Sequence, residues 1–360
     1  MYLQTLKLTQ FKNYTSRAFD FNARFNVITG NNGVGKTNLL DAIYFLCMTK
    51  SFFGGTEKNL IQKETDFTRV AGVYRLENGM KQLDVVAKVM KHKKKSFETN
   101  GKVYDRLLEH VGRLPVVMIA PDDTLIATGG SEERRKFANN TLSQKNPNYL
   151  NALVRYNRLL KQRNALLKSK ADWLDMNLLQ SYNDHLVEPA EFIFAAREAW
   201  TRELTPLFNE YYGLIAGKRE AVKIEYKSPL QKDSFAILLD KALDKDKILE
   251  RTTVGIHRDD FVFFMDDMPL KRFASQGQRK SFVIALKLAQ YQFLAKASPE
   301  LPILLMDDIF DKLDRERVAN LVAVIGESGF GQVFITDTHP TRVSELLDIP
   351  HQVIDVEKNI

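Results

Sequence analysis

The spacing of hydrophobic residues changes twice along the 360-residue chain. Up to residue 140, apolar and polar positions alternate with the two-residue period of β-strands, as in Met1–Phe11 and Lys81–Val89. From 141 to 250 the chain is highly charged, and its leucines recur at helical spacing. From 251 to 360 short apolar runs alternate with helical segments. The pattern predicts an α/β lobe built from residues 1–140 and 251–360, with a helical lobe inserted at residues 141–250.

Two local signals refine these elements. Asn100-Gly101 follows a lysine-rich run at residues 91–95 and is typical of the two-residue turn of a β-hairpin. Pro189 lies inside the helical lobe and has no N–H to donate. We therefore expect it to kink or break its helix.

The strongest chemical signal is the stretch from Gly30 to Thr37, which fits the phosphate-binding pattern G-x-x-x-x-G-K-[ST]. The apolar run Phe25–Thr29 predicts a strand before it, and helical spacing follows it, so backbone N–H groups would face a polyphosphate. Lys36 is expected on the β- and γ-phosphates of ATP, and the Thr37 hydroxyl on Mg²⁺. A glycine-rich turn without a ligand is the alternative. The predicted nucleotide-binding residues are Gly30, Asn31, Asn32, Gly33, Val34, Gly35, Lys36, Thr37 and Asn38.

A second apolar run, Pro302–Met306, ends in the carboxylates of Asp307 and Asp308. Such a run is typical of a buried parallel strand that ends in a Walker B site. Asp307 would hold Mg²⁺ opposite Thr37. Asp308 would act as the general base that polarises the attacking water. The alternative is a core strand whose acids cap the following turn.

About thirty residues earlier, Ser275-Gln276-Gly277-Gln278 stands before a strongly periodic helical segment. Ser275 can cap that helix, and Gly277 allows a close approach of the backbone. The element is similar to the signature motif of ABC-type ATPases. In that motif, Ser275 and Gln278 would take part in catalysis and Gly277 would bind the nucleotide. An ordinary capped amphipathic helix is the alternative.

Phe310–Asp314 and His339 resemble the D-loop and the switch histidine of the same ATPases. More than two hundred residues separate the P-loop from the signature and Walker B motifs. This split arrangement resembles that of the SMC-like branch of ABC-type ATPases, whose members act on DNA. Within that branch the chain is similar to the RecF family. The blocks that carry this resemblance are Phe11–Tyr14, Gly30–Ile43, Ala120–Asp123, Glu133–Phe137, Leu160–Lys168 and Val254–Asp260.

The resemblance implies an ABC-type ATPase lobe, a mixed sheet with a P-loop, that carries an inserted helical lobe. It also implies a homodimer that forms head to tail on ATP, with slow, DNA-stimulated hydrolysis as the switch. RecF-like proteins recognise junctions of single-stranded and duplex DNA at gaps, promote RecA loading with RecO and RecR, and are needed for the SOS response. The rival interpretation is an ABC-type nucleotide-binding motor subunit of a non-DNA system. No glutamine occupies the expected Q-loop position, which leaves Asp122 and Asp123 as candidates for that role.

The charge of the chain agrees with a polyanionic partner, because its net charge is +7 and its pI is about 9.2. Basic runs offer sequence-independent phosphate contacts, although solvated faces are the alternative. The candidate DNA contacts are Lys93, Lys94, Lys95, Arg134 and Arg135.

Cellular location is indicated only indirectly by the sequence. Cys47 is the single cysteine, so no disulfide framework exists. The first residues are typical of a strand and not of a signal peptide, and no apolar run approaches ~20 residues. We therefore expect a cytoplasmic protein.

Overall fold

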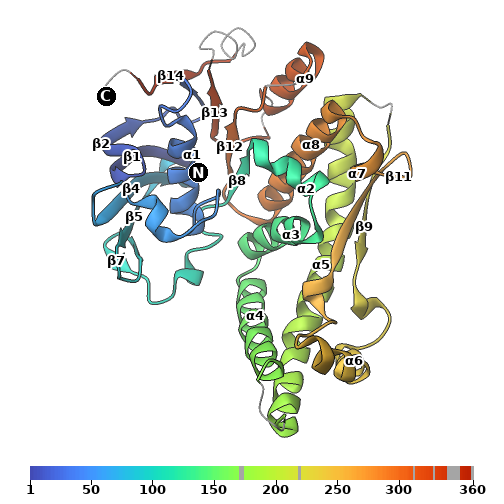
Figure 1. Ribbon diagram of the computed structural model, residues 1–360. Coiled ribbons are helices and arrows are strands. Elements are labelled where there is room, and N and C mark those ends of the chain that lie inside the picture. The colour runs from blue at the N-terminus through green and yellow to red at the C-terminus, as the bar shows by residue number, and fades with distance from the viewer. Residues whose placement is uncertain (170–173, 218–219, 311–312, 327–328, 339–348, 358–360) are drawn as a thin grey trace. The chain divides into compact units, whose positions relative to one another are not determined.

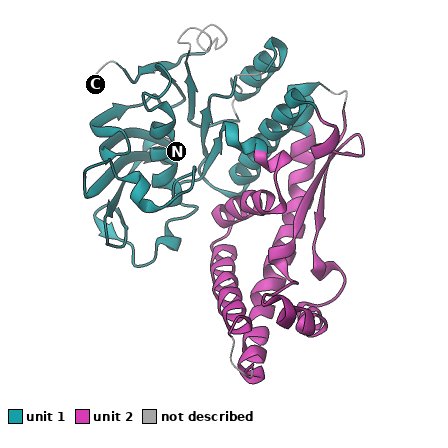
Figure 2. Ribbon diagram, viewed as in Figure 1, with its two compact units in different colours: residues 1–124, 210–219, 275–360 teal, residues 125–209, 220–274 magenta. Residues whose placement is uncertain are grey.

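The computed structural model describes residues 1–169, 174–217, 220–310, 313–326, 329–338 and 349–357. The chain forms two compact units, shown in Figure 2. Unit 1 contains residues 1–124, 210–219 and 275–360, and unit 2 contains residues 125–209 and 220–274. Both ends of the chain therefore belong to one unit, and a middle segment makes up the other.

These boundaries differ from those expected at residues 140 and 250. Helix α3 (Ser131–Lys145) belongs to unit 2 because it packs on α4 (Pro147–Leu167) and on strand β10 (Asp260–Met265). Strand β10 in turn pairs with β9 (Val222–Lys227), so residues 251–274 also fall in unit 2. Packing and strand pairing between distant segments, and not the local change of composition, therefore decide where each unit ends.

Unit 1 contains two sheets (Figure 1). The antiparallel sheet has the order β2-β1-β4-β5-β6-β7, and the parallel sheet has the order β14-β3-β13-β12-β8. The antiparallel strands are β1 (Tyr2–Phe11), β2 (Tyr14–Asp20), β4 (Phe67–Leu76), β5 (Lys81–Met90), β6 (Ser96–Thr99) and β7 (Lys102–Val103). The parallel strands are β3 (Phe25–Thr29), β8 (Val116–Ile119), β12 (Ile303–Asp307), β13 (Val333–Asp337) and β14 (Gln352–Asp355).

Helix α1 (Lys36–Met48) packs against strands of both sheets, including β4 and β12. Nearly all of its side chains are buried, which is the pattern of a helix that lies inside a core. Its first two residues, Lys36 and Thr37, are also the last two of the P-loop, so this core fixes the position of the loop. Among the described residues, unit 1 also contains α8 (Gln276–Ala297), which packs against β8, and α9 (Arg315–Gly326).

Unit 2 is mostly helical, as the charged and periodic middle of the chain predicts. Its helices are α3, α4, most of α5 (Met176–Ala216), α6 (Phe235–Leu249) and α7 (Leu270–Phe273), and α2 (Thr124–Thr128) begins at its border. It also contains an antiparallel sheet with the order β11-β10-β9, in which β11 is Met268–Pro269. The inserted helical lobe that the sequence predicts therefore also contains a small sheet.

Two local expectations have clear outcomes. The hairpin is confirmed, since β6 and β7 pair across Asn100 and Gly101, whose φ angles are 49° and 77°. Pro189 does not break its helix, because α5 runs through it without interruption. Leu186, Ala190 and Ile193 are fully buried around it, and this packing outweighs the one hydrogen bond that proline removes.

Candidate nucleotide-binding site

The P-loop connects β3 to α1, as its motif predicts. Gly30, Gly33 and Gly35 have φ angles of 144°, 86° and 116°, which glycine adopts without strain. Gly35 has a second constraint, because an added Cβ would lie 2.5 Å from Asn13 Nδ2 and 2.9 Å from the Tyr14 hydroxyl. The motif glycine therefore allows both the turn and the close approach of the β1–β2 turn.

The β1–β2 turn holds the P-loop through side chains that sequence reasoning did not assign. Asn13 Nδ2 donates to the carbonyl oxygen of Val34 at 2.8 Å, and the Tyr14 hydroxyl donates to that of Gly35 at 3.0 Å. Asn38 Nδ2 donates to Asn13 Oδ1 at 2.8 Å, which ties the same turn to α1. Burial raises the pKa of Tyr14 to about 12, so this hydroxyl remains a donor at neutral pH.

Lys36 lies in the interior of the loop. Its Nζ donates to the carbonyl oxygens of Gly30 at 2.6 Å and Asn31 at 2.9 Å, and the residue is buried. A cation in this place can reach a phosphate bound by the backbone N–H groups of the loop. This geometry agrees with the role predicted for Lys36.

Thr37 and Asp307, 270 residues apart in sequence, meet at the carboxyl end of the parallel sheet. The Thr37 hydroxyl lies 3.0 Å from Asp307 Oδ1 and 2.9 Å from Oδ2. Burial raises the pKa of the Asp307 carboxyl, while hydrogen bonds from Thr336 and Thr37 act in the opposite direction. A hydroxyl and a carboxylate side by side form an oxygen donor set that fits Mg²⁺.

Thr336 on β13 links Asp307, the last residue of β12, to Asp308. Its hydroxyl donates to Asp307 Oδ1 at 2.8 Å and accepts from the backbone N–H of Asp308 at 3.0 Å. Asp308 has a φ angle of 46°, a left-handed conformation that is uncommon outside glycine. Thr336 thus fixes Asp308 in a strained position, an arrangement that local sequence patterns do not signal.

One cavity of about 260 Å³ joins these groups in unit 1. A site of this volume with cationic, hydroxyl and carboxylate groups fits a polyphosphate with a divalent cation. The lining residues are Asn32, Gly33, Gly35, Lys36, Thr37, Asn38, Asp307, Asp308, Thr336 and Thr338.

The signature segment forms a capping box at the start of α8. Ser275 Oγ accepts from the Gln278 N–H at 3.2 Å, and Gln278 Oε1 accepts from the Ser275 N–H at 2.7 Å. Gln276 lines a second cavity of about 210 Å³, together with Pro121 and Asp308. Among the described lining residues of the P-loop cavity, none comes from residues 275–278. Asp308 borders both cavities.

The two candidates for the Q-loop role differ in burial. Asp123 is buried, lies 2.6 Å from Lys287 Nζ, and accepts from the Ala120 N–H at 2.8 Å. Burial raises the pKa of Asp123, and the ion pair with Lys287 opposes that rise. Asp122 is exposed. Asp123 is therefore committed to a structural ion pair in this structure.

Two further candidates lie outside the described residues. They are His339, the candidate switch residue, and residues 311–312 of the D-loop. The described D-loop acid, Asp314, caps α9 by accepting from the Arg317 N–H at 2.9 Å.

The five candidate DNA contacts fall into two groups. Lys95 Nζ lies 2.6 Å from Glu57 and donates to Thr49 O at 2.7 Å. Arg134 binds both oxygens of Asp260, at 2.7 and 3.0 Å, and Arg135 donates to Asp259 O at 2.7 Å. Lys93 and Lys94, in the β5–β6 connection, are exposed. Lys93 and Lys94 are therefore the accessible candidates. Lys95, Arg134 and Arg135 make contacts within the chain.

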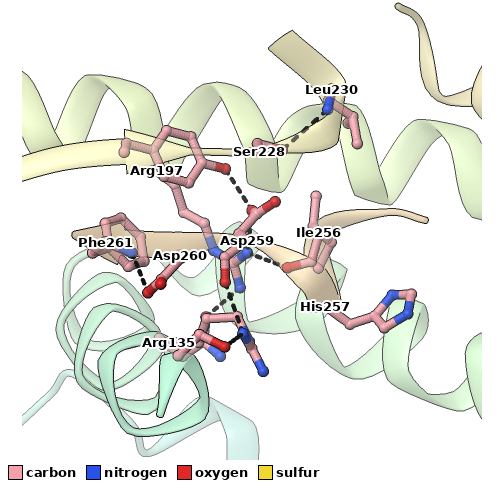
Figure 3. A network of polar contacts seen from close by, with 12 residues as sticks. Arg135, Arg197, Ser228, Leu230, Ile256, His257, Asp259, Asp260 and Phe261 are labelled. Atoms are coloured by element: carbon pink, nitrogen blue, oxygen red, sulfur yellow. Dashed lines mark hydrogen bonds and ion pairs between the residues drawn. The ribbon is translucent and has the colours of Figure 1, made fainter. Parts of the chain in front are cut away.

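The blocks specific to the RecF resemblance form buried polar contacts in unit 2, part of which Figure 3 shows. Arg197 lies 2.5 Å from Asp259 Oδ2, and both side chains are buried. Arg163 is fully buried and lies 2.7 Å from Asp246 Oδ2. His257 lies 2.8 Å from the Tyr156 hydroxyl, and burial lowers its pKa to about 4. These residues therefore hold unit 2 together.

A P-loop and a Walker B strand that line one cavity, on a parallel sheet beside a capped signature helix, define the class of ABC-type ATPase heads. The family model described as the RecF/RecN/SMC N-terminal domain matches residues 2–360. The DNA replication and repair protein RecF of Flavobacterium johnsoniae is 42% identical over 99% of this chain and 99% of its own length. That of Cytophaga hutchinsonii is 42% identical over 96% of this chain and 91% of its own. The chain belongs to the RecF family.

Solved structures agree with this assignment. A structure of the recombination mediator protein RecF with ATP in the RecFOR pathway superposes with a TM-score of 0.88 at 27% identity, over 98% of this chain and 95% of that chain. An Smc head bound to the C-winged helix domain of ScpA gives a TM-score of 0.57 at 16% identity, covering 96% and 91%, which shows a shared fold. The predicted fold class and the predicted family are confirmed. Within the described ranges, no helix is both long and apolar enough to cross a bilayer.

Proposed function

We propose that the protein is an ATP-dependent DNA-binding protein of recombinational repair and replication, in which ATP closes a homodimer on gapped DNA. The observation that carries the proposal is the single cavity in which Lys36 and Thr37 meet Asp307 and Asp308. Its setting is a chain that matches the RecF family over nearly its full length. Relatives named DNA replication and repair proteins support the DNA part of the proposal.

The proposed reaction is slow hydrolysis of ATP that DNA stimulates. Lys36 supplies the cation for the β- and γ-phosphates, and the N–H groups of the loop supply hydrogen bonds. Thr37 and Asp307 would hold Mg²⁺, which neutralises charge on the transferred phosphoryl group. Asp308 accepts the proton of the attacking water. The Thr336 hydroxyl accepts from the backbone N–H of Asp308 and so holds this residue in place.

The proposed dimer places each ATP between the P-loop of one subunit and the signature segment of its partner. Ser275, Gly277 and Gln278 stand at a helix N-terminus, where backbone dipoles favour a phosphate. The cavity of the P-loop draws none of its described lining residues from that segment, so a second copy would have to supply it. ATP then shifts the population toward a closed dimer, and hydrolysis releases it.

The proposed partners follow from the family. One relative of known structure is described as a recombination mediator protein of the RecFOR pathway. For this chain we propose recognition of single-strand/duplex junctions, cooperation with RecO and RecR, promotion of RecA loading, and a part in the SOS response. A protein that acts on bacterial chromosomal DNA would be located in the cytoplasm.

Light scattering with and without ATP, on gapped DNA and on plain duplex, tests the proposal. We expect a dimer only with ATP, and tighter binding to the gapped DNA. Lys36→Ala should lose ATP binding and remain a monomer, and Lys36→Arg should bind ATP yet hydrolyse it poorly, since a planar guanidinium does not replace a point charge. Unchanged ATP affinity in Lys36→Ala would remove the P-loop from the proposal. An ATP-driven dimer with no affinity for any DNA would favour a motor subunit of a non-DNA system.

A further inference from the structure

The last described residues of the chain lie against the start of the P-loop. Strand β14 pairs with β3 in parallel, and the Val356 N–H then donates to Thr29 O at 3.0 Å. Val356 is fully buried. A Cβ added to Gly30 would lie 3.0 Å from Val356 Cγ2 and 3.4 Å from Glu357 Cγ. The absence of a side chain at Gly30 thus makes room for the C-terminal segment as well as for the turn.

Two contacts fix the position of this segment. The Arg17 guanidinium, from β2, donates to the carbonyl oxygens of Val356 and of Asp355, the latter at 3.3 Å. The Glu357 N–H donates to Asp355 Oδ1 at 2.9 Å. The backbone that leads into Glu357, including its own N–H, is therefore held in place before its side chain makes any contact.

The Glu357 carboxylate binds the P-loop itself. Its Oε1 accepts from the backbone N–H of Asn31 at 2.5 Å. The carbonyl oxygen of the same peptide group, that of Gly30, accepts from Lys36 Nζ at 2.6 Å. One peptide group is therefore held between a carboxylate at its N–H end and an ammonium at its C=O end. Both contacts are charge-assisted, so together they define the orientation of that peptide.

We propose that Glu357 is a positioning residue of the nucleotide site, which acts through the Gly30–Asn31 peptide group. Its carboxylate keeps the N–H of that group turned away from Lys36 and the carbonyl turned toward it. The first turn of the P-loop is thereby ordered before ATP arrives, so less conformational entropy is lost on binding. The inference rests on the proposed binding of ATP at this loop. It assigns Glu357 to nucleotide affinity and not to the chemical step.

Three substitutions of Glu357 test separately the length of its side chain, its charge and its hydrogen bond to Asn31. Glu357→Ala removes the acceptor, and we expect affinity for a fluorescent ATP analogue to fall about tenfold, as for the loss of a charged hydrogen bond. The KM for ATP should rise with it while kcat stays near that of the wild type. Glu357→Gln keeps the reach and an acceptor oxygen and should retain most of the affinity. Glu357→Asp keeps the charge but is one methylene shorter, so it should resemble the Ala variant.

The control is Glu191→Ala, which removes an exposed carboxylate from α5 in unit 2. Wild-type affinity in Glu357→Ala, or a fall in kcat at constant KM, would overturn the positioning role. A Gln variant as weak as the Ala variant would overturn the hydrogen-bond mechanism. If the wild type itself binds no ATP, the proposed function fails; if it binds ATP and Glu357→Ala binds equally well, only the inference fails. Thermal unfolding of each variant shows whether it is folded, and the Gln and Asp pair still tests the role if the Ala variant is not.

Discussion

At the scale of single residues, the neighbouring acids Asp307 and Asp308 differ in burial and in hydrogen bonding. Asp307 is buried and shares hydrogen bonds with Thr37 and Thr336, whereas Asp308 is exposed and receives none of those hydroxyl protons. This difference supports the roles proposed for the two residues at the cavity wall, a cation ligand for Asp307 and a general base for Asp308. The strained φ angle of Asp308 agrees with a functional position.

The first prediction concerns Asp308→Asn, which keeps the shape of the side chain and removes its basicity. ATP hydrolysis should fall by roughly 10²–10⁴-fold, the contribution typical of a general base. ATP binding should persist, and the ATP-bound dimer should remain on gapped DNA for longer. Single-turnover hydrolysis and dissociation from DNA measure these effects, with Asp20→Asn as a control at an exposed acid of β2. Unaffected turnover would leave Asp308 with a structural role alone.

The second prediction concerns pH and His110, which is fully buried in unit 1. Its Nε2 lies 2.6 Å from Leu46 O and its Nδ1 lies 3.2 Å from the Tyr104 hydroxyl. Burial lowers its pKa from 6.5 to about 4. Between those two values the unfolded chain binds a proton that the folded chain does not. The stability from neutral His110 is therefore complete above pH 6.5 and is lost as the pH falls toward 4, by up to about 3 kcal/mol.

Urea unfolding of the wild type and of His110→Gln between pH 7.5 and 4.5 checks this expectation. The difference in free energy of unfolding between the two proteins should narrow as the pH falls, because glutamine does not titrate. A difference that stays constant over this range would show that His110 keeps an ordinary pKa in the folded state.

At the scale of elements, the start of α8 forms a helix cap, and this cap is compatible with the proposed signature role. The Ser275 and Gln278 side chains cap the helix through each other, and the same geometry leaves the N-terminus of the helix accessible. A cap contributes about 1 kcal/mol to helix stability, so a substitution at Ser275 disturbs both roles. A test of the signature role must therefore distinguish it from the role of Ser275 as a helix cap.

The third prediction uses Ser275→Arg with Ser275→Thr as its matched control. The arginine should block the contact with the ATP of the partner subunit while the monomer still binds ATP. Threonine keeps the hydroxyl and the cap and should dimerise as the wild type does. Light scattering with ATP distinguishes the two, and circular dichroism reports any loss of helix. Normal ATP-driven dimerisation of Ser275→Arg would leave Ser275 with the capping role alone.

Elements encoded by local patterns were predictable, and elements made by distant pairing were not. The P-loop, the Walker B strand and the hairpin at Asn100-Gly101 each have a short signature. The β9–β10 pair has none, because α6 lies between its two strands in the chain. Arg163 has a charge that favours the surface, and its burial depends on Asp246, 83 residues away. Glu357 finds its partner Asn31 across 326 residues.

At the scale of the whole molecule, the net charge of +7 is compatible with DNA, and the proposed place of contact is the pair of accessible lysines in the β5–β6 connection. The fourth prediction is that Lys93→Ala with Lys94→Ala weakens binding to all duplex sequences equally. The slope of log affinity against log salt concentration should become shallower by roughly 0.9 for each lost phosphate contact. ATP-driven dimerisation should be unchanged.

Titrations of gapped and plain duplex DNA over a range of salt measure this slope. Lys245→Ala with Lys247→Ala removes two exposed lysines of α6 in unit 2 and serves as the charge-matched control. Wild-type affinity and slope in the Lys93/Lys94 variant would move the DNA to another surface.

The order of strands in the parallel sheet has a consequence for synthesis on the ribosome. Strand β3, which leads into the P-loop, pairs on its two sides with β13 and β14, more than 300 residues later in the chain. At 5–20 residues per second the nascent chain waits roughly 15–60 s before those neighbours exist. During that time some of the strands that pack against the apolar helix α1 have not been synthesised, so its side chains stay exposed. We therefore expect the emerging chain to bind chaperones. A truncated product that lacks the last thirty residues would lose both neighbours of β3 at once.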